Sequence, residues 1–130
     1  MEKLGKRQKF IMLEAARRYL KFIVLRGQHK NMTNSAIGLG TWTEYKSAFE
    51  AGLVKAYSSL RKNDIAWWTV TEKGAEIVNN IIHQAIIISY QKLNPLMHDN
   101  IMAKYAVALH KIETDMEKEN FPYRVYEQEN

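Results

Sequence analysis

The chain has 130 residues, of which 46% are hydrophobic and 25% are charged, and this composition is typical of a globular domain. It contains no cysteine, which excludes disulfide bonds and thiolate metal sites. The apolar run Ala85–Ile88 is far too short to span a bilayer, and the charged N-terminus lacks the apolar segment of a secretory signal. We therefore expect a cytoplasmic protein with no membrane contact.

The net charge of +5 is distributed unevenly along the chain. Residues 1–73 carry 14 Lys and Arg and 6 Asp and Glu, a net charge of +8, whereas residues 74–130 carry 5 and 8, a net charge of −3. A basic first half favours a polyanionic partner such as a nucleic acid. The same composition is also expected of an ordinary solvated surface, so charge alone leaves both interpretations open.

The first predicted element is a helix over residues 6–26, where apolar residues recur at helical spacing. Gly27 stands just past the last periodic residue, which is a common position for a glycine that ends a helix. Residues 28–41 are rich in Asn, Gly, Ser and Thr, and we expect a loop there, with a short helical turn around residues 33–37.

A second helix is predicted over residues 43–51. Thr41 or Thr43 is expected to cap its start, since a threonine oxygen accepts hydrogen bonds from the first free backbone N–H groups. Gly52 is expected to end it.

A β-hairpin is predicted over residues 53–70, because two β-prone runs flank the polar segment 61–64. Its second run contains the adjacent residues Trp67 and Trp68. Side chains alternate between the two faces of a strand, so Trp68 shares a face with Val70. We expect that face to meet the core, which predicts that Trp68 is buried and Trp67 is exposed.

Two long helices complete the chain. The first is expected to start after Thr71 and to end near Leu93, before the break at Asn94–Pro95, and the second to span residues 97–119. Their apolar residues recur in steps of three and four, which is a heptad-like seam typical of packed helices. The residues on or beside this seam are Ile81, Ile82, Ile88, Met102, Tyr105, Leu109, Ile112 and Met116, and they are the predicted dimer interface if the two helices form the dimerisation arm that the family resemblance described below implies. The tail 120–130 is open to interpretation as a strand, a packed arm or a disordered end.

The sequence lacks the residue patterns of common catalytic and metal sites. Its four histidines share no metal-ligand spacing, and His83 lies among isoleucines, where a hydrogen-bonded core or interface histidine is expected. Residues 38–41 (GLGT) lack the lysine and the spacing of a phosphate-binding loop. The acidic residues in 113–119 are typical of a solvated helix end. We therefore predict no catalytic residues, no cofactor and no metal, and we do not expect an enzyme.

Three short segments resemble parts of the winged helix-turn-helix superfamily. They are Phe49–Val54 (FEAGLV) at the end of the second helix, Arg61 and Lys62 at the hairpin tip, and Val70–Gly74 (VTEKG). The resemblance covers roughly residues 8–80. The two long helices that follow look like the dimerisation arms of PadR, MarR and archaeal coiled-coil winged-helix regulators.

The resemblance implies a fold class and a domain organisation. The chain would be mainly α with a small β-hairpin (α+β), a winged helix-turn-helix protein with two long C-terminal helices. Residues 1–74 would form the winged-helix domain, with a recognition helix 43–51 and a wing 53–70. Residues 75–119 would form a helical dimerisation arm, followed by the tail 120–130.

The resemblance also implies a DNA interface. Helix 43–51 would enter the major groove of double-stranded DNA, and the wing tip would contact the backbone or the minor groove. The implied nucleic-acid-binding residues are Thr41, Thr43, Lys46, Ser47, Arg61, Lys62, Arg17, Arg18 and Lys21. Glu44 and Glu50 place negative charge near the same face, and residues 31–40 are short and Gly-rich for the first helix of the motif. The expected function is a dimeric transcriptional regulator or architectural protein.

A different class of function is compatible with the same fold. Winged-helix domains also serve as protein-interaction modules, and an accessory or inhibitor protein of a mobile element would bind another protein through its helical arm. An enzyme is the third hypothesis, and no residue pattern supports it.

Overall fold

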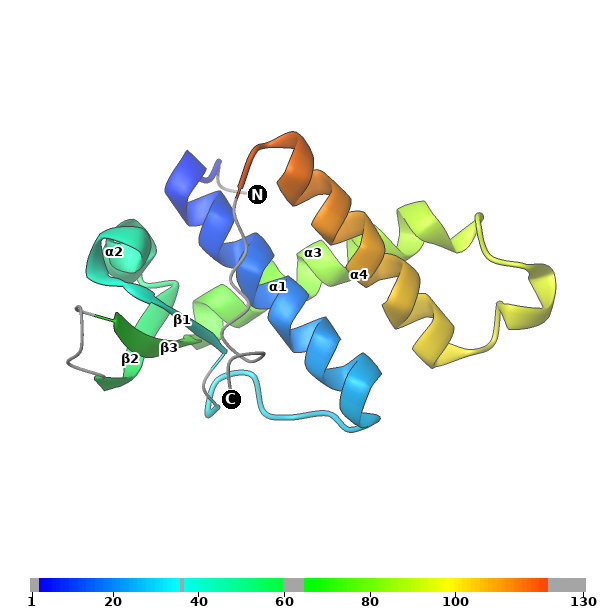
Figure 1. Cartoon of the computed structure of the whole chain (residues 1–130), viewed down its shortest axis with the longest axis horizontal. Helices are drawn as coiled ribbons and strands as arrows, with labels where there is room; N and C mark the ends of the chain where they lie inside the picture. The colour runs from blue at the N-terminus through cyan, green and yellow to red at the C-terminus, as the bar shows by residue number, and fades with distance from the viewer. Residues whose placement is uncertain (1–2, 36, 60–64, 122–130) are drawn as a thin grey trace.

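The computed structural model describes residues 3–35, 37–59 and 65–121 (Figure 1). The protein is mainly helical with a small three-stranded antiparallel sheet, so the expectation of an α+β fold is confirmed. The elements in chain order are α1 (Lys6–Arg26), β1 (Gly38–Thr41), α2 (Trp42–Glu50), β2 (Val54–Ser59), β3 (Ile65–Val70), α3 (Glu72–Tyr90), the 3₁₀ helix η2 (Pro95–Met97) and α4 (Ile101–Lys118).

The sheet contains one strand that the sequence analysis did not predict. Its order is β1-β3-β2, and β1 pairs with β3 from Gly38 opposite Trp68 onward. The prediction of a loop over residues 28–41 is therefore wrong for its last four residues. The described residues between 33 and 37 form turns and bends instead of the predicted helical turn. Since two of the four β1 residues are glycines, this strand depends on its hydrogen bonds with β3 more than on local propensity.

The two adjacent tryptophans lie on opposite faces of β3, as the alternation of side chains predicted. Trp68 is 1% exposed, and Gly38 lets β1 pass close to its ring, because a Cβ atom at this glycine would lie 2.1 Å from the ring. The prediction that Trp68 is buried is confirmed. Trp67, on the other face, is half-buried instead of fully exposed. Its neighbour on that face, Thr69, is also buried and donates its hydroxyl to the Met32 carbonyl at 2.8 Å. The segment after α1 therefore covers part of the second face of the sheet.

The capping residues act as the sequence indicated. Gly27 has φ 65°, and its N–H donates to the Ile23 carbonyl at 2.7 Å, which closes α1. Thr71 caps α3 by accepting the Gly74 N–H at 3.1 Å. Thr41, and not Thr43, is the N-cap of α2, which begins one residue earlier than predicted.

Two asparagines set the boundaries between α3 and α4. Asn94 Oδ1 accepts the Leu96 N–H at 3.0 Å and starts the 3₁₀ helix at the predicted proline break. Asn100 Oδ1 accepts the Ala103 N–H at 3.0 Å and starts α4. The predicted boundaries, near Leu93 and at residue 97, were therefore wrong by a few residues.

The turn after α2 is held against the start of α3. The Thr71 N–H donates to the Leu53 carbonyl at 3.0 Å, and the Thr71 hydroxyl donates to the Gly52 carbonyl at 2.5 Å. A Cβ atom at Gly74 would lie 2.0 Å from the Leu53 carbonyl oxygen. The glycine of the VTEKG segment is therefore required by the contact between the hairpin and α3.

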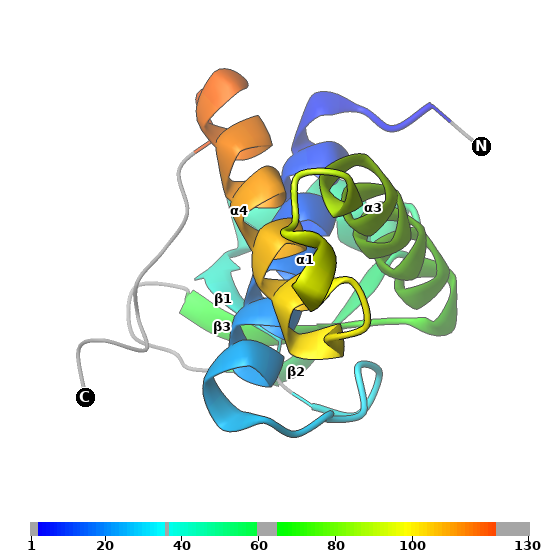
Figure 2. The same ribbon diagram turned by 90° about the vertical axis from the view of Figure 1, so that its right-hand side faces the viewer.

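The three long helices pack on one another, each against the other two (Figure 2). α4 runs antiparallel to α1: Lys9 near the start of α1 is ion-paired with Glu119, and the His29 ring just past its end lies 5.8 Å from the Tyr105 ring. One cluster of buried apolar side chains includes residues from all four α-helices and from β2 and β3. The predicted arm, residues 75–119, thus shares its core with residues 1–74.

Candidate nucleic-acid interface and a cationic pocket

Helix α2 has an exposed polar edge that includes most of the predicted groove residues. Thr43 and Lys46 are exposed. Ser47 is half-buried, and its hydroxyl oxygen accepts a hydrogen bond from Gln8 Nε2 at 3.2 Å. Thr41 precedes them as the N-cap. These four residues therefore lie together on or just before α2.

Glu44 is engaged with the start of its own helix. Its Oε1 accepts the Thr41 N–H at 2.8 Å and the Thr41 hydroxyl at 3.1 Å, which is a capping box. The carboxylate therefore compensates the positive end of the helix dipole. Of the two acids that placed negative charge near this face, only Glu50 is fully exposed, at the opposite end of α2.

The N-terminal turn of α1 lies beside the start of α2. Arg7 Nη1 donates to the Thr43 carbonyl at 3.2 Å. The cations Lys3, Lys6 and Arg7 are exposed, as is Lys46 on α2. The sequence analysis did not select these three N-terminal cations, although their clustering in KLGKRQK is visible in the sequence. Arg7 therefore adds positive charge next to the polar edge of α2.

The same helix also exposes two aromatic side chains. Trp42 and Phe49 are each 42% exposed, and their ring centroids are 5.2 Å apart. The Trp42 ring also lies 5.3 Å from that of Tyr45, which is buried, and this burial raises the pKa of the Tyr45 phenol. Exposed aromatic residues of this kind are enriched at protein–protein interfaces.

Two of the predicted phosphate contacts on α1 are core residues. Arg17 is 1% exposed, and its Nε donates to Glu14 Oε1 at 2.7 Å, while its Nη1 lies 3.9 Å from Glu113 Oε2 of α4. Arg18 is 9% exposed, and its Nε lies 3.6 Å from Glu14 Oε2. The assignment of Arg17 and Arg18 to surface phosphate contacts is therefore wrong, because both guanidinium groups are buried beside the buried carboxylate of Glu14.

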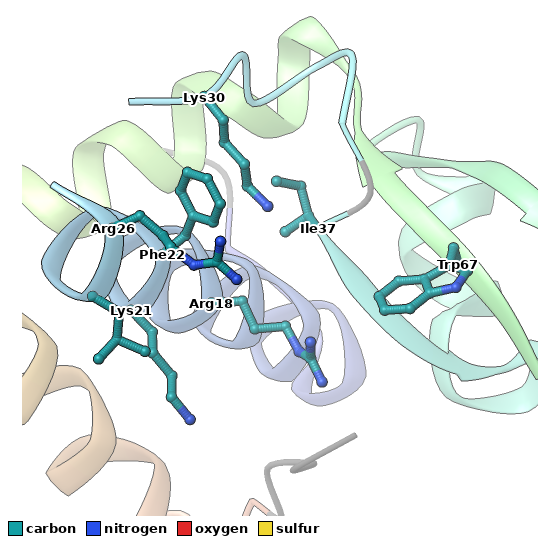
Figure 3. Close-up of a pocket in the computed structure, with 8 residues that line it drawn as sticks. Arg18, Lys21, Phe22, Arg26, Lys30, Ile37 and Trp67 are labelled. Atoms are coloured by element: carbon teal, nitrogen blue, oxygen red, sulfur yellow. The ribbon is translucent and has the colours of Figure 1, made fainter. Parts of the chain in front are cut away.

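The third of those cations, Lys21, is half-buried and lines a hollow of about 250 Å³ at the C-terminal half of α1 (Figure 3). Its lining residues are Arg18, Lys21, Phe22, Leu25, Arg26, Lys30, Ile37 and Trp67. Four of these eight are cations and none is an acid. We call this hollow the cationic pocket. The sequence analysis did not predict this pocket, although it singled out Trp67, which is one of the lining residues.

Two cations in the cationic pocket share one aromatic ring. Lys30 Nζ lies 4.7 Å from the centroid of the Phe22 ring, and Arg26 Cζ lies 5.8 Å from it. Burial, and then the nearby charge of Arg18, lowers the pKa of Lys30 below its ordinary value. Positive charge is thus concentrated here against an apolar wall.

The residues predicted for a dimer interface fall into three groups. Ile82, Ile112 and Met116 are buried within a single chain, at 7%, 1% and 0% exposure, so they are core residues and cannot form an intermolecular contact. Ile88 is the exposed member, at 52%. The half-buried members are Ile81, Met102, Tyr105 and Leu109. The heptad-like seam therefore packs largely inside the monomer.

Predictions were also made for His83, for the hairpin tip, and for metal and membrane sites. His83 is exposed in the single chain, so the core alternative of the prediction is wrong, and the interface alternative stays a prediction. Arg61 and Lys62 lie outside the described residues. Among the residues that the structure describes, no group of three or more His, Asp or Glu side chains is placed to hold a metal ion. No helix within the described ranges has the length and apolarity needed to cross a membrane.

No protein-family model, curated protein or solved structure matches this chain. The function of the two surfaces is therefore inferred from their residues and geometry.

Proposed function

We propose that the chain binds double-stranded DNA as a winged-helix protein, with α2 in the major groove and the β2–β3 hairpin as the wing. The observation that carries the proposal is the sheet order β1-β3-β2 with α2 inserted between β1 and β2. The Arg7–Thr43 hydrogen bond holds the first turn of α2 beside the start of α1. Thr43 and Lys46 are exposed on this helix.

The proposal includes a departure from the helix-turn-helix pattern. In the described chain a single helix lies between β1 and β2, and it follows β1 directly. The supporting contacts come instead from α1, through the Arg7–Thr43 and Gln8–Ser47 hydrogen bonds. α1 therefore takes the positioning role that the first helix of the motif would have.

The proposed phosphate contacts come from the start of α1, the start of α2 and the hairpin tip. Arg7 contacts the start of α2, the exposed cations Lys3 and Lys6 precede it in the chain, and backbone N–H groups at a helix N-terminus also favour phosphate oxygens. Arg61 and Lys62 at the hairpin tip complete the set as proposed in the sequence analysis. In this proposal these cations take the place of Arg17 and Arg18, which are buried beside Glu14.

Binding to duplex DNA tests this proposal. Fluorescence anisotropy with mixed-sequence duplexes, repeated at several salt concentrations, should show binding that weakens steeply with salt. Lys46→Ala should weaken binding and lower the log–log salt slope by about one, since one phosphate contact or one nearby charge is lost. The matched control is Lys92→Ala, an exposed lysine just past the far end of α3. The absence of duplex binding at low salt would reject the proposal.

We also propose that the protein is a homodimer, and we place the contact at the far end of the helical pair. Ile87 and Ile88 of α3 and Ile101 of α4 are 50%, 52% and 52% exposed. A groove of about 540 Å³ lies between α3 and α4 beside Ile88 and is rimmed by Lys111 and Asp115. Exposed apolar surface next to a groove is typical of interaction sites.

Sedimentation velocity tests the dimer. Ile88→Lys should convert a dimer to a monomer, because it places an unpaired charge in an apolar contact. Tyr57→Lys, on the exposed surface of β2, is the matched control and should leave the dimer intact. A wild-type protein that sediments as a monomer at high concentration would exclude this interface.

A second candidate function is supported by the Trp42–Phe49 pair. Aromatic side chains on the outer surface of α2 fit a protein partner better than they fit DNA base edges. If the protein instead binds another protein through α2, Trp42→Ala should abolish a stoichiometric complex with that protein. Under the DNA proposal the same variant retains most of its duplex binding, since the phosphate contacts remain.

A further inference from the structure

A second groove between α3 and α4 is lined by cations and hydroxyl groups. It has a volume of about 340 Å³ and shares only Lys111 with the groove beside Ile88. We call it the basic groove. The described residues that line it are Ser89, Lys92, Val107, His110, Lys111, Thr114 and Lys118, and none of them is an acid.

The Ser89 hydroxyl is the buried polar group of the basic groove. Ser89 is 4% exposed, and buried hydroxyl groups in proteins are normally hydrogen-bonded. In a helix the usual acceptor is the carbonyl one turn earlier, and Thr114 follows this pattern by donating to the His110 carbonyl at 2.9 Å. The Ser89 hydroxyl makes no hydrogen bond to any residue in the described ranges. A donor in the wall of the basic groove is therefore available to a ligand.

The cations of the basic groove differ in what already binds them. Lys111 Nζ donates to both carboxylate oxygens of Asp115, at 2.5 and 2.7 Å, so its charge is offset inside the protein. Lys92 and Lys118 are exposed, and neither is ion-paired with a residue that the structure describes. His110 is exposed as well and supplies ring N–H groups. Two uncompensated ammonium groups and one imidazole thus remain for a ligand.

The basic groove includes the C-terminal end of α3, where free carbonyl groups carry partial negative charge. Two of these carbonyls are hydrogen-bonded: that of Ser89 accepts the Lys92 N–H at 3.0 Å, and that of Tyr90 accepts the Leu93 N–H at 3.1 Å. The first bond also fixes the Lys92 backbone one turn beyond Ser89. The ammonium group of Lys92 therefore offsets the helix dipole at the place where the Ser89 hydroxyl opens into the groove.

We propose that the basic groove binds an elongated small molecule with two or more phosphate groups. One phosphate accepts hydrogen bonds from the Ser89 hydroxyl, Lys92 and His110, and another pairs with Lys118. Hydrogen bonds from charged donors to phosphate oxygens are the strong ones in proteins, and a hydroxyl adds a directed donor. This chemistry gives the buried Ser89 hydroxyl the partner that it lacks in the chain.

The spacing of the cations sets the length of the ligand. His110 and Lys118 are eight residues apart on α4, which is about 12 Å along the helix axis. A single phosphate is too small to contact the cations at both ends of such a groove. Two sources have the required chemistry: a linear chain of phosphates, and an organic molecule with a phosphate at each end.

Isothermal titration calorimetry on the full chain tests the proposal at constant ionic strength with tripolyphosphate, a hexose bisphosphate and inorganic phosphate. At least one of the two elongated probes should bind more tightly than inorganic phosphate. Lys92→Met and Lys118→Met should each weaken that binding about tenfold, since each removes a hydrogen bond between charged groups. Lys55→Met, at an exposed position on β2, removes the same charge outside the groove and should bind as the wild type does.

Ser89→Ala separates a built site from general attraction to a cationic surface. The substitution leaves the net charge unchanged, so general attraction predicts no effect, whereas the loss of the hydroxyl donor should weaken binding about fivefold. Ser35→Ala, a half-buried serine in the segment after α1, is the matched control. Thermal melting by circular dichroism verifies that every variant is folded.

The outcomes identify the ligand and keep this site separate from the duplex site. Tighter binding of tripolyphosphate identifies a phosphate chain, and tighter binding of the hexose bisphosphate identifies a phosphorylated organic molecule. Lys92→Met should leave duplex binding unchanged, and Lys46→Ala should leave the binding of both probes unchanged. The proposal is overturned if neither elongated probe binds, if inorganic phosphate binds as tightly as both, or if the Ser89, Lys92 and Lys118 variants bind like the wild type.

Discussion

Two segments of α1 contain similar cations that have opposite structural roles. At its start, Lys6 and Arg7 are exposed beside α2. In its middle, Arg17 and Arg18 are buried, and Glu14, which is 3% exposed, lies within 3.6 Å of both. The difference comes from the carboxylate: a buried acid one turn away allows a guanidinium group to enter the core, and a segment without one keeps its cations at the surface. A cationic residue can therefore be predicted to lie at the surface only after the acidic residues one turn away have been considered.

The largest loss of stability is expected when the carboxylate that distinguishes the two segments is removed. Glu14→Ala leaves Arg17 and Arg18 buried without their shared partner, and we expect the free energy of unfolding to fall by about 3–5 kcal/mol. Urea unfolding followed by circular dichroism measures it. Glu50→Ala, on the exposed end of α2, is the control and should change stability by less than about 0.5 kcal/mol. Equal stability of the two variants would show that the buried ion pairs are not needed.

A matched pair of arginine substitutions compares the segments directly. Arg17→Met should destabilise the protein by several times more than Arg7→Met, because it removes the closer of the two buried cations from Glu14 and leaves Glu113 without its Arg17 partner. Arg7→Met should instead weaken duplex binding and reduce its log–log salt slope by about one, with little change in stability. Denaturant unfolding and anisotropy titrations on both variants provide the four values. If Arg7→Met bound duplex DNA with the wild-type salt slope, the start of α1 would not be part of the interface.

A smaller effect is expected at Lys30. Its pKa in the folded protein lies below the ordinary value of 10.5, so the unfolded chain binds more protons between the two values. Stability should therefore rise as the pH increases through that interval, and below it the charged, partly buried amine lowers stability. Lys30→Met should raise the midpoint of thermal unfolding modestly at neutral pH, and this gain should vanish above pH 10.5. Scanning calorimetry at several pH values, with Lys55→Met on β2 as the control, checks it. A lower midpoint at neutral pH would contradict it.

Local signals in the sequence predicted much of the fold. Gly27, Thr41 and Thr71 lie at helix ends, and each acts through its own backbone or side-chain geometry, which a sequence shows directly. β1 could not be found in this way, since GLGT has no strand propensity of its own and becomes a strand only by pairing with β3. Asn94 and Asn100 are cap residues that the sequence also shows, but the helix boundaries were predicted from the heptad-like spacing of the apolar positions instead.

The candidate site was harder to predict than the fold. The grouping of Thr43, Lys46 and Ser47 on α2 followed from helical spacing alone. The burial of Arg17 depends partly on Glu113 of α4, about a hundred residues away in the chain, and no local pattern indicates that packing. The cationic pocket likewise joins Lys30 and Trp67 across a long separation. Surfaces made by one element were predictable, and those made by several required the tertiary structure.

The contact between Gly74 and the Leu53 carbonyl has a mechanical consequence. With no side chain between them, the first turn of α3 rests on the backbone where β2 begins, and two hydrogen bonds from Thr71 hold it there. The base of the hairpin and the start of α3 are therefore joined directly through their backbones. A force on the hairpin base would therefore act on α3 as well, and through α3 on the helices α1 and α4 that pack against it. An event at the hairpin would thus be transmitted about 20 Å to the far end of α3, over the helical rise of some fourteen residues.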